Sequence, residues 1–405
     1  MKKVVLGFSA TLLLLASCNN DDDNTAMPET QESTLTIENV VEARDFVQSG
    51  AFFGEGSEEV EAPVVLPGQS IQLKFNAGNG QALMFATMYG SSKDWFFAPE
   101  NPGIALYDDS GSAITGDVSS KIRLWNNGTK DDSTGDPENN PVAMVSGVNA
   151  PALMKLDLAY DAMASEFTLT LTNTSGGTDN ETPFSPGVWA VSNVLGGELL
   201  NPMPFYVEGE HSNPEITAIA EGGNNEPLAV KTEENTGIIT GLSPAIVVVY
   251  QGNENPLFRT GEKDYGMGLK ELAQKGDISG LMEALQNAEG IEAVYGVGEA
   301  PLPPGEEISI QIETTPDTKI AYATMFGYSN DWFYANSQGI AAGTTGDITA
   351  QTGLFDNGTG VDQYPGAGNN QAAFGGTPET EDKGITEVDA GYLPPVSDVI
   401  RVTIN

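Results

Sequence analysis

Polar and apolar residues alternate with a period of two along short segments spread over most of the chain. Examples are residues 34–37, 70–75, 167–172, 308–312 and 400–404. Such alternation places one face of a strand in a core and the other in water, as in antiparallel sheets. Turns rich in Gly, Pro, Asn and Asp separate these segments, which fits the 47 glycines and 24 prolines. The pattern therefore predicts an all-β protein built from antiparallel β-sandwiches.

Two short segments in the second half of the chain have helical spacing instead. They cover residues 269–273 and 277–285, and Asp277 stands where it can cap the second helix. A weaker internal similarity relates residues 184–229 to residues 242–285, since each begins with an apolar residue and Ser-Pro, followed by an apolar strand. We therefore expect a strand–loop–helix segment that is duplicated inside the second domain and is lacking in the first.

A pair of linked motifs occurs twice in the same order. Residues 86–98 read ATMYGSSKDWFFA and residues 323–335 read ATMFGYSNDWFYA, which are identical at nine of thirteen positions. A second motif follows each copy, as LWNNGT at 124–129 and as LFDNGT at 354–359. Two motifs repeated in order indicate a duplicated domain, in which the two loops meet.

These features divide the chain into four parts. Residues 1–17 resemble a bacterial lipoprotein signal, because two lysines precede an apolar run that ends in Leu-Ala-Ser and is too short to span a bilayer. Cys18 would carry the lipid and, as the only cysteine, excludes an internal disulfide. Residues 18–33 are polar and acidic and are predicted to be a flexible tether. We place the first domain at 34–165 and the second at 166–405.

The residues after the cysteine also indicate a destination. An asparagine directly after the lipid-bearing residue is similar to the outer-membrane sorting pattern, and the acidic run is similar to the surface-export tag of some lipoproteins. We therefore expect a cell-envelope protein that is anchored in the outer membrane through its lipid.

Acidic residues strongly outnumber basic ones. The chain has 57 acidic and 17 basic residues, and its formal net charge is −40. Such a field repels nucleic acid, so no nucleic-acid partner is expected, and it favours bound cations. The only histidine is His211, which argues against histidine-based metal sites and against Ser-His-Asp or Cys-His catalysis.

The repeated motifs place a carboxylate beside large apolar residues. Asp94 and Asp331 directly precede Trp-Phe, and burying a carboxylate there is costly unless a positive or hydrogen-bonding group meets it. The facing Asn-Gly-Thr loop supplies backbone groups, and Asn126 and Asp356 add side-chain oxygens. Together these oxygens suit a hard cation of the calcium type. Alternatively, both aspartates only accept hydrogen bonds from loop amides and hold the loop closed.

The pairing of an S-x-D-W-F strand with an L-aromatic-[D/N]-x-G-T loop resembles the spondin N-terminal domain. Further matches are residues 46–50, 184–189 and 255–258, and the resemblance covers nearly all of residues 35–405. It implies tandem C2-like antiparallel β-sandwiches with a calcium ion at one end of each. Bacterial members are often lipid-anchored or otherwise exported, with tandem copies.

The resemblance also implies calcium ligands in both copies. The aspartate before Trp-Phe corresponds to Asp94 and Asp331, and the loop acid corresponds to Asn126 and Asp356. A backbone carbonyl precedes the loop acid in the family pattern. It belongs here to Trp125 in the first copy and to Phe355 in the second.

The chain departs from the family pattern at the last acidic ligand. Lys130 and Gly360 stand at that position, and Asp131, Asp132 or Asp362 could substitute if the loop shifts. In the first copy the lysine could instead pair with the motif aspartate and replace the ion. The second copy therefore has the stronger set of ligands.

Three kinds of function are compatible with these residues. The first is a non-enzymatic, envelope-anchored binding or adhesion protein that recognises an extracellular protein or glycan. The second is a glycan hydrolase that uses paired carboxylates, and the third is a scaffold component of the outer membrane. A glycan-binding surface needs exposed aromatic residues, for which the candidates are Trp189, Tyr206 and Tyr334.

Overall fold

The computed structural model describes residues 30–57, 63–299 and 301–405. The expected signal segment, Cys18 and most of the expected tether lie outside the described residues. The last three residues of the expected tether, 31–33, belong to the described part. They form the beginning of strand β1 (Gln31–Asn39) and pair with another strand. The tether predicted to reach residue 33 is therefore too long at its C-terminal end.

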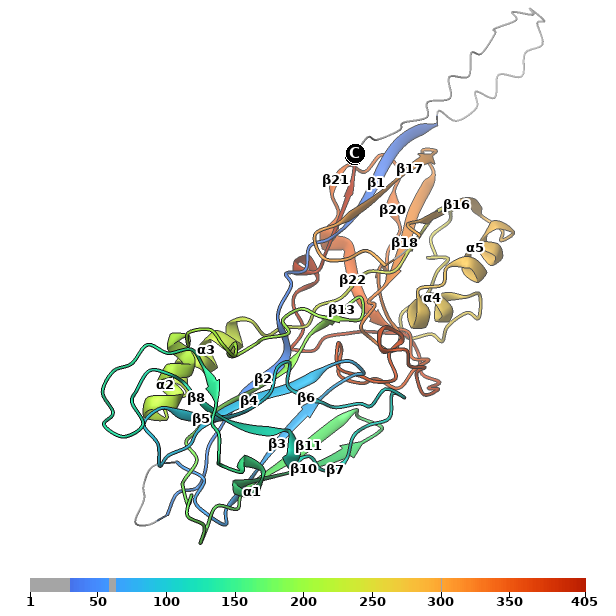
Figure 1. The fold of residues 1–405 in the computed structure, drawn as a ribbon. Coiled ribbons are helices and arrows are strands. Elements are labelled where there is room, and N and C mark those ends of the chain that lie inside the picture. Colours follow the sequence, from blue (N-terminus) through green and yellow to red (C-terminus); the bar gives the residue numbers. More distant parts are fainter. Residues whose placement is uncertain (1–29, 58–62, 300) are drawn as a thin grey trace, which may run out of the picture.

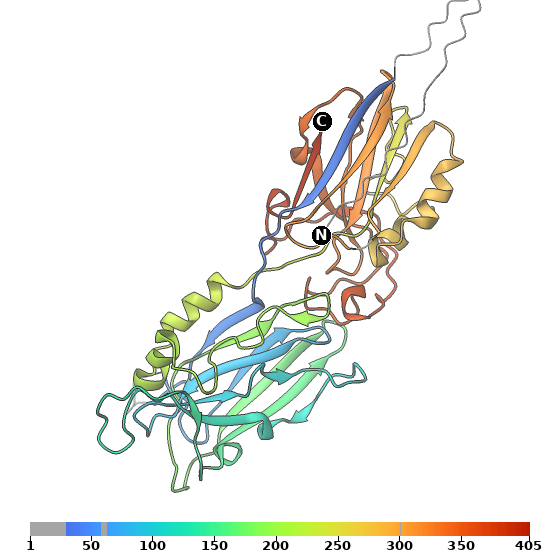
Figure 2. The same cartoon turned by 45° about the horizontal axis from the view of Figure 1, so that its top comes forward.

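The chain forms two antiparallel β-sandwiches that lie end to end and give an elongated molecule (Figures 1 and 2). Short helices cover one face of each sandwich (Figure 1). The predicted all-β class is thus confirmed. No helix among the described residues is long and apolar enough to cross a membrane.

In the first sandwich, a large sheet packs on a smaller one. The large sheet has the order β2 (Phe46–Phe52), β12 (Gly187–Ser192), β4 (Ala82–Met88), β5 (Trp95–Pro99), β8 (Ile122–Asn126), β9 (Ala143–Met144), with β6 (Ile104–Ala105) beside β4. The smaller sheet has the order β3 (Ser70–Asn76), β11 (Glu166–Asn173), β10 (Met154–Asp161), β7 (Gly116–Asp117). The helices are α1 (Ala150–Leu153), α2 (Pro214–Gly222) and α3 (Glu226–Glu234).

The second sandwich has the same layout. Its large sheet has the order β16 (Ile291–Val297), β15 (Ala245–Gln251), β18 (Thr318–Met325), β19 (Trp332–Asn336), β22 (Thr352–Asp356), β23 (Thr386–Glu387), with β20 (Ile340–Ala341) beside β18. Its smaller sheet has the order β17 (Glu307–Thr314), β1, β24 (Ile400–Ile404), β21 (Gly346–Asp347). The helices are α4 (Leu269–Lys275) and α5 (Ser279–Gln286), and a hairpin of β13 (Val194–Leu195) and β14 (Glu198–Leu199) lies between the sandwiches.

Two patterns of burial explain the layers. In the smaller sheets one face is exposed to solvent. Buried and partly exposed residues therefore alternate strictly along β11, with Phe167, Leu169 and Leu171 buried. The central strands of the large sheets are apolar on both faces. In β15, for example, Val247 faces the core between the sheets and Val248 faces the core under the helices. A strand covered on both sides loses the period of two that marks a half-exposed strand.

Strand pairing corrects the expected domain boundaries. Strand β1 pairs with β17 and β24 and so belongs to the second sandwich. Strands β11 and β12 pair with β3, β10, β2 and β4 and so belong to the first. The boundary predicted between residues 165 and 166 is therefore wrong, because alternation shows which face of a strand is buried but not which sheet it joins.

The duplicated strand–loop–helix segment contributes one copy to each sandwich. Strand β12 lies between β2 and β4, whereas β15 lies between β16 and β18, and each has a register shift directly after Val191 or Val249. Segment 184–229 thus covers the first sandwich, where Ile216 and Ile219 of α2 pack on the large sheet. The expectation that the first domain lacks this segment is wrong, as is its placement inside the second.

The order of the elements differs between the two copies. In the first sandwich the strand–helix segment follows the other strands, whereas in the second it precedes most of them. In the first sandwich, β11 follows β10 through a short turn and pairs with it. The corresponding strands of the second sandwich, β1 and β24, also pair, but they are the first and the last strands of the chain. The two sandwiches are therefore circular permutations of each other, and the first is inserted between β1 and β15 of the second.

Candidate metal centre

Three aspartates meet at the end of the second sandwich. Asp331 directly precedes β19 and Asp356 ends β22, and Trp332 is paired with Asp356 in the ladder between these strands. Asp362 follows on the next loop. One carboxylate oxygen from each of the three lies within 4.8 Å of the others, and the cluster could hold a metal ion. Asp331 is buried, Asp356 is half-buried and Asp362 is exposed.

The two oxygens of Asp331 have different surroundings. Its Oδ2 accepts hydrogen bonds from the amide of Thr359 at 2.7 Å, the hydroxyl of Thr359 at 2.9 Å and the amide of Gly360 at 2.8 Å. Its Oδ1 is buried and has no hydrogen-bond partner among the described residues. A buried carboxylate oxygen without a partner is costly, and a cation at the cluster removes that cost.

Asp356 is oriented by its own turn. Its Oδ1 accepts a hydrogen bond from the amide of Gly358 at 2.7 Å, and Gly358 has a positive φ of 68°. One of the two carboxylate oxygens of Asp356 lies within 4.8 Å of an oxygen of Asp331 and of Asp362. The preceding residue, Phe355, buries its ring against Phe258 and Phe333, so only its main-chain carbonyl remains as a candidate ligand.

The pKa values of the three carboxyl groups are raised by burial and by the acidic groups around them. Burial raises the pKa of Asp331, and the neighbouring Asp356 raises it further. Burial also raises the pKa of Asp356. The pKa of Asp362 is raised to about 7 by loss of hydration and by the charges of Asp356 and Asp331, although its contact with water weakens this effect. A cation would offset both causes by pairing with the charged forms.

A fourth acid lies close to this cluster and was not predicted. The charge of Glu381 raises the pKa of Asp356 and of Asp362, and its amide donates to the carbonyl of Thr359 at 3.0 Å. Its carboxylate pairs with Lys383 at 2.6 Å. A long loop separates Glu381 from the repeated motifs, and no local pattern in the sequence singles it out among the many acidic residues.

The first sandwich repeats the buried aspartate. Oδ2 of Asp94 accepts hydrogen bonds from the amides of Thr129 at 2.8 Å and Lys130 at 2.9 Å, while its Oδ1 has no partner among the described residues. Asn126 accepts a hydrogen bond from the amide of Gly128 at 2.7 Å, as Asp356 does from Gly358. The predicted contact between the Asp-Trp-Phe strand and the Asn-Gly-Thr loop is thus present in both copies.

The first site differs from the second in the hydrogen bonds that its third acid accepts. Asp132, four residues after Gly128 as Asp362 is after Gly358, accepts hydrogen bonds from Nε1 of Trp95 at 2.6 Å and Nδ2 of Asn126 at 3.2 Å. In the second copy Trp332 faces Asp362 without a hydrogen bond of normal geometry. Two N–H donors therefore meet Asp132, whereas within residues 30–57, 63–299 and 301–405 no such pair meets Asp362.

The other residues predicted near the first site have separate roles. Lys130 pairs with Glu221 at 3.5 Å, so the considered pair between Lys130 and Asp94 is wrong. Asp131 accepts hydrogen bonds within its own turn, including one from the amide of Thr134 at 2.7 Å. Trp125 buries its ring and donates from Nε1 to the carbonyl of Ala98 at 3.1 Å, which leaves only its main-chain carbonyl as a candidate ligand.

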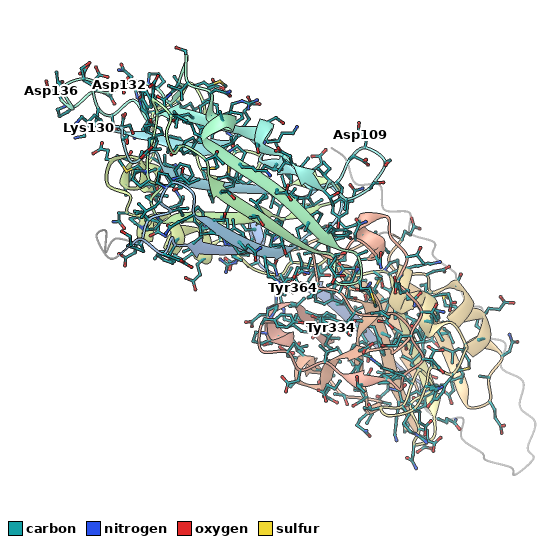
Figure 3. The ribbon with its side chains drawn as sticks, turned by 90° about the horizontal axis from the view of Figure 1, so that it is seen from below. Asp109, Lys130, Asp132, Asp136, Tyr334 and Tyr364 are labelled. Carbon is teal, nitrogen blue, oxygen red and sulfur yellow. The ribbon has the colours of Figure 1, made fainter. Side chains whose placement is uncertain are left out.

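None of the aromatic residues considered for glycan binding is fully exposed. Tyr206 and Tyr334 are buried, and Trp189 is half-buried against Phe75. Figure 3 labels Tyr334 in the second sandwich. Exposed aromatic side chains in the described part of the chain are Phe53, Tyr265 and Tyr392. Tyr392 lines a surface hollow of about 900 Å³ that also contains Arg44 and Arg401.

Comparison with known proteins adds no relative. A search against protein-family models and a search of curated protein sequences found no match to this chain.

Proposed function

We propose that this chain is a non-enzymatic binding or adhesion protein of the cell envelope, built from two spondin-like β-sandwiches, of which the second binds calcium. The ligands come from Asp331, Asp356 and Asp362, with the carbonyl of Phe355 as a further candidate. The observation that carries the proposal is that Asp331, whose buried Oδ1 has no hydrogen-bond partner among the described residues, lies beside two other carboxylates.

The ligand chemistry supports calcium. All side-chain ligands at the cluster are oxygens, which suit a hard cation, and the described part of the site holds no nitrogen or sulfur ligand. Two oxygens bound to one calcium ion at 2.3–2.6 Å lie at most about 5 Å apart, whereas the shorter distances around magnesium limit that separation to about 4 Å. One oxygen of each of the three carboxylates lies within 4.8 Å of the others, which falls inside the range that one calcium ion can bridge.

The geometry of the cluster argues against the hydrolase alternative. Paired carboxylates of glycosidases flank a substrate, with a gap of about 5 Å or more between them for the sugar or water. Here one member, Asp331, is fully buried and its Oδ2 is occupied by three loop donors. Such a carboxylate does not reach a glycosidic bond. Binding of an unidentified extracellular protein or glycan remains the proposed role of the surface.

The fold also suits attachment through the N-terminus. Strand β1 begins at the end of the second sandwich that is remote from the first (Figure 1). An anchor at Cys18 would therefore hold the second sandwich near the membrane and project the first away from it. No ligand is assigned to the projecting end.

Thermal unfolding of residues 19–405 tests the calcium site. We expect calcium at about 100 times its dissociation constant to stabilise the chain by about 2.7 kcal/mol relative to EDTA. Asp356→Asn keeps the acceptor for the Gly358 amide and reproduces the residue of the first copy, so it should fold but lose this stabilisation. An equal calcium shift in both proteins, or none in the wild type, would contradict the site.

The binding role needs a separate test in the source cell. Deletion of the chain should reduce adhesion to extracellular surfaces and leave glycan hydrolysis unchanged. The converse result, lost hydrolysis with unchanged adhesion, would favour the hydrolase.

A further inference from the structure

The loop that carries Asp362 continues directly into the junction between the two sandwiches. The next residue, Gln363, is buried, and its Nε2 donates to the carbonyl of Met163 in the first sandwich at 3.2 Å. Further along the loop, Gln81 of the first sandwich donates to the carbonyl of Gly366 at 2.9 Å. Ala367 is fully buried in the hydrophobic core of the first sandwich.

The loop makes further contacts with the first sandwich. The amide of Asn79 donates to Oδ1 of Asn369 at 3.0 Å, and the amide of Asn369 donates to the hydroxyl of Ser165 at 2.9 Å. The ring of Phe374 lies so close to Gly78 that a Cβ there would sit 2.5 Å from it. The segment 363–374 is therefore the second sandwich's docking loop on the first.

The docking loop is also hydrogen-bonded to the segment that carries Asp331. The amide of Gln363 donates to Oδ1 of Asn330 at 2.9 Å, and Asn330 directly precedes Asp331. The amide of Gly366 donates to the carbonyl of Tyr328 at 2.8 Å. A movement of Asp362 relative to Asp331 thus acts on the residues that hold the docking loop in place.

The first copy offers a comparison within the same molecule. The loop after its Asn-Gly-Thr motif, residues 130–140, is mostly exposed and lies at the end of the first sandwich remote from the junction. Figure 3 shows Lys130, Asp132 and Asp136 at that end, whereas Tyr364 of the docking loop lies at the junction. Only the second cluster is therefore placed to act on how the sandwiches are arranged.

We infer that calcium bound by Asp331, Asp356 and Asp362 locks the docking loop and thereby fixes the two sandwiches in one relative orientation. This inference rests on the calcium site proposed above. Without the ion, three mutually repelling carboxylates leave Asp362, the exposed member, free to move outward with Gln363. The sandwiches then remain joined through the chain connections at 40–45 and 235–244 and through the β13–β14 hairpin, whose Val194 packs in the core of the second sandwich, and their orientation varies more widely.

Pulsed electron–electron spin resonance measures this orientation directly. Cys18 is the only native cysteine, so residues 19–405 with Ser120→Cys and Glu271→Cys carry one exposed label site on each sandwich. We expect a narrow distance distribution in calcium and a broader one in EDTA. Asp362→Asn should give the broad distribution in both buffers, whereas Asp132→Asn, the corresponding change in the first copy, should behave like the wild type.

Calcium titration of the same labelled proteins separates the possible failures. If calcium binds and the distribution does not change, the locking inference is wrong and the site stands. If calcium does not bind, both the site and the inference fail.

A variant outside the cluster provides an independent test. Gln81→Ala removes a docking contact from the first sandwich without touching a candidate ligand. Because coupling between two equilibria is reciprocal, it should broaden the distribution in calcium and weaken calcium affinity by about fivefold or more. Unchanged affinity together with an unchanged distribution would contradict the coupling.

Discussion

At the scale of single residues, the two carboxylate oxygens of each buried motif aspartate have different surroundings. Oδ2 of Asp331 and of Asp94 closes the facing loop, and Oδ1 of each has no hydrogen-bond partner in the described part of the chain. The two alternatives considered from the sequence, loop closure and cation binding, are therefore not exclusive at Asp331. Loop closure is common to both copies, whereas the surrounding charges differ.

Substitution of Asp362 separates its proposed role as a calcium ligand from any role in stabilising the fold. In EDTA at pH 8, Asp362→Asn should unfold at a urea concentration equal to or higher than the wild type, because it removes repulsion and no hydrogen bond of normal geometry. In calcium the order should reverse, since the variant lacks a ligand. A variant that is less stable than the wild type in EDTA would show that Asp362 has a structural role instead.

The raised pKa values predict how this difference depends on pH. Because the folded-state pKa of Asp362 lies above that of the unfolded chain, the folded state binds more protons between pH 4 and about 7. The contribution of this carboxyl to stability in EDTA is therefore present at pH 4 and is lost as the pH rises toward 7. The advantage of Asp362→Asn should grow over that interval in urea titrations. A constant difference would contradict the raised pKa.

Restoring the missing acid should create a second site. Asn126→Asp gives the first copy three carboxylates, Asp94, residue 126 and Asp132, in the arrangement of the second copy. Calcium stoichiometry should then rise from one to two ions per chain in equilibrium dialysis. Asn126→Ala serves as the control, and unchanged stoichiometry in the aspartate variant would mean that Lys130 or the loop conformation excludes the ion.

Sequence reasoning reached part of this site. Asp331, Asp356 and Asp362 were all candidates, because they lie in or beside a motif that occurs twice. Glu381 was missed because only the tertiary fold brings its loop to the cluster. The pairing of Trp95 with Asp132 was also missed, since the direction of an indole N–H is not encoded in residue spacing.

At the scale of elements, alternation predicted strands well and their partners poorly. The half-exposed strands β1, β3, β11, β17 and β24 all fall in segments with a period of two. Sheet membership depends on contacts between distant segments, so neither the return of β12 to the first sandwich nor the pairing of β1 with β24 could be predicted. The repeated motifs revealed the duplication but not its circular permutation.

The placement of β1 has a measurable consequence. Ile37 is buried in the core of the second sandwich, so Ile37→Ala should destabilise that sandwich by about 2–5 kcal/mol. Hydrogen exchange should then speed up in β15 and β18 rather than in β2–β5. Leu171→Ala, in the corresponding strand β11, should show the opposite distribution. Faster exchange in the first sandwich of the Ile37 variant would contradict the strand assignment.

At the scale of the whole molecule, the two copies of one fold have different positions and different charges. The second cluster lies beside the junction, and its third acid, Asp362, is not met by a pair of N–H donors from the described residues. The first lies at the free end, and its third acid, Asp132, accepts hydrogen bonds from Trp95 and Asn126. The two copies are therefore similar frameworks, and among the described residues the second has a cluster of three acids that could hold a metal ion. The chain's net charge of −40 is compatible with cation binding, and the proposed position of the cation rests on the geometry of the three-aspartate cluster.

The most direct test of this account is isothermal titration calorimetry of calcium into chelator-treated residues 19–405. We predict one ion per chain, unchanged binding in Asp132→Asn and loss of binding in Asp356→Asn. Absence of binding in the wild type, or binding that survives Asp356→Asn but not Asp132→Asn, would contradict the assignment of the calcium site to the second sandwich.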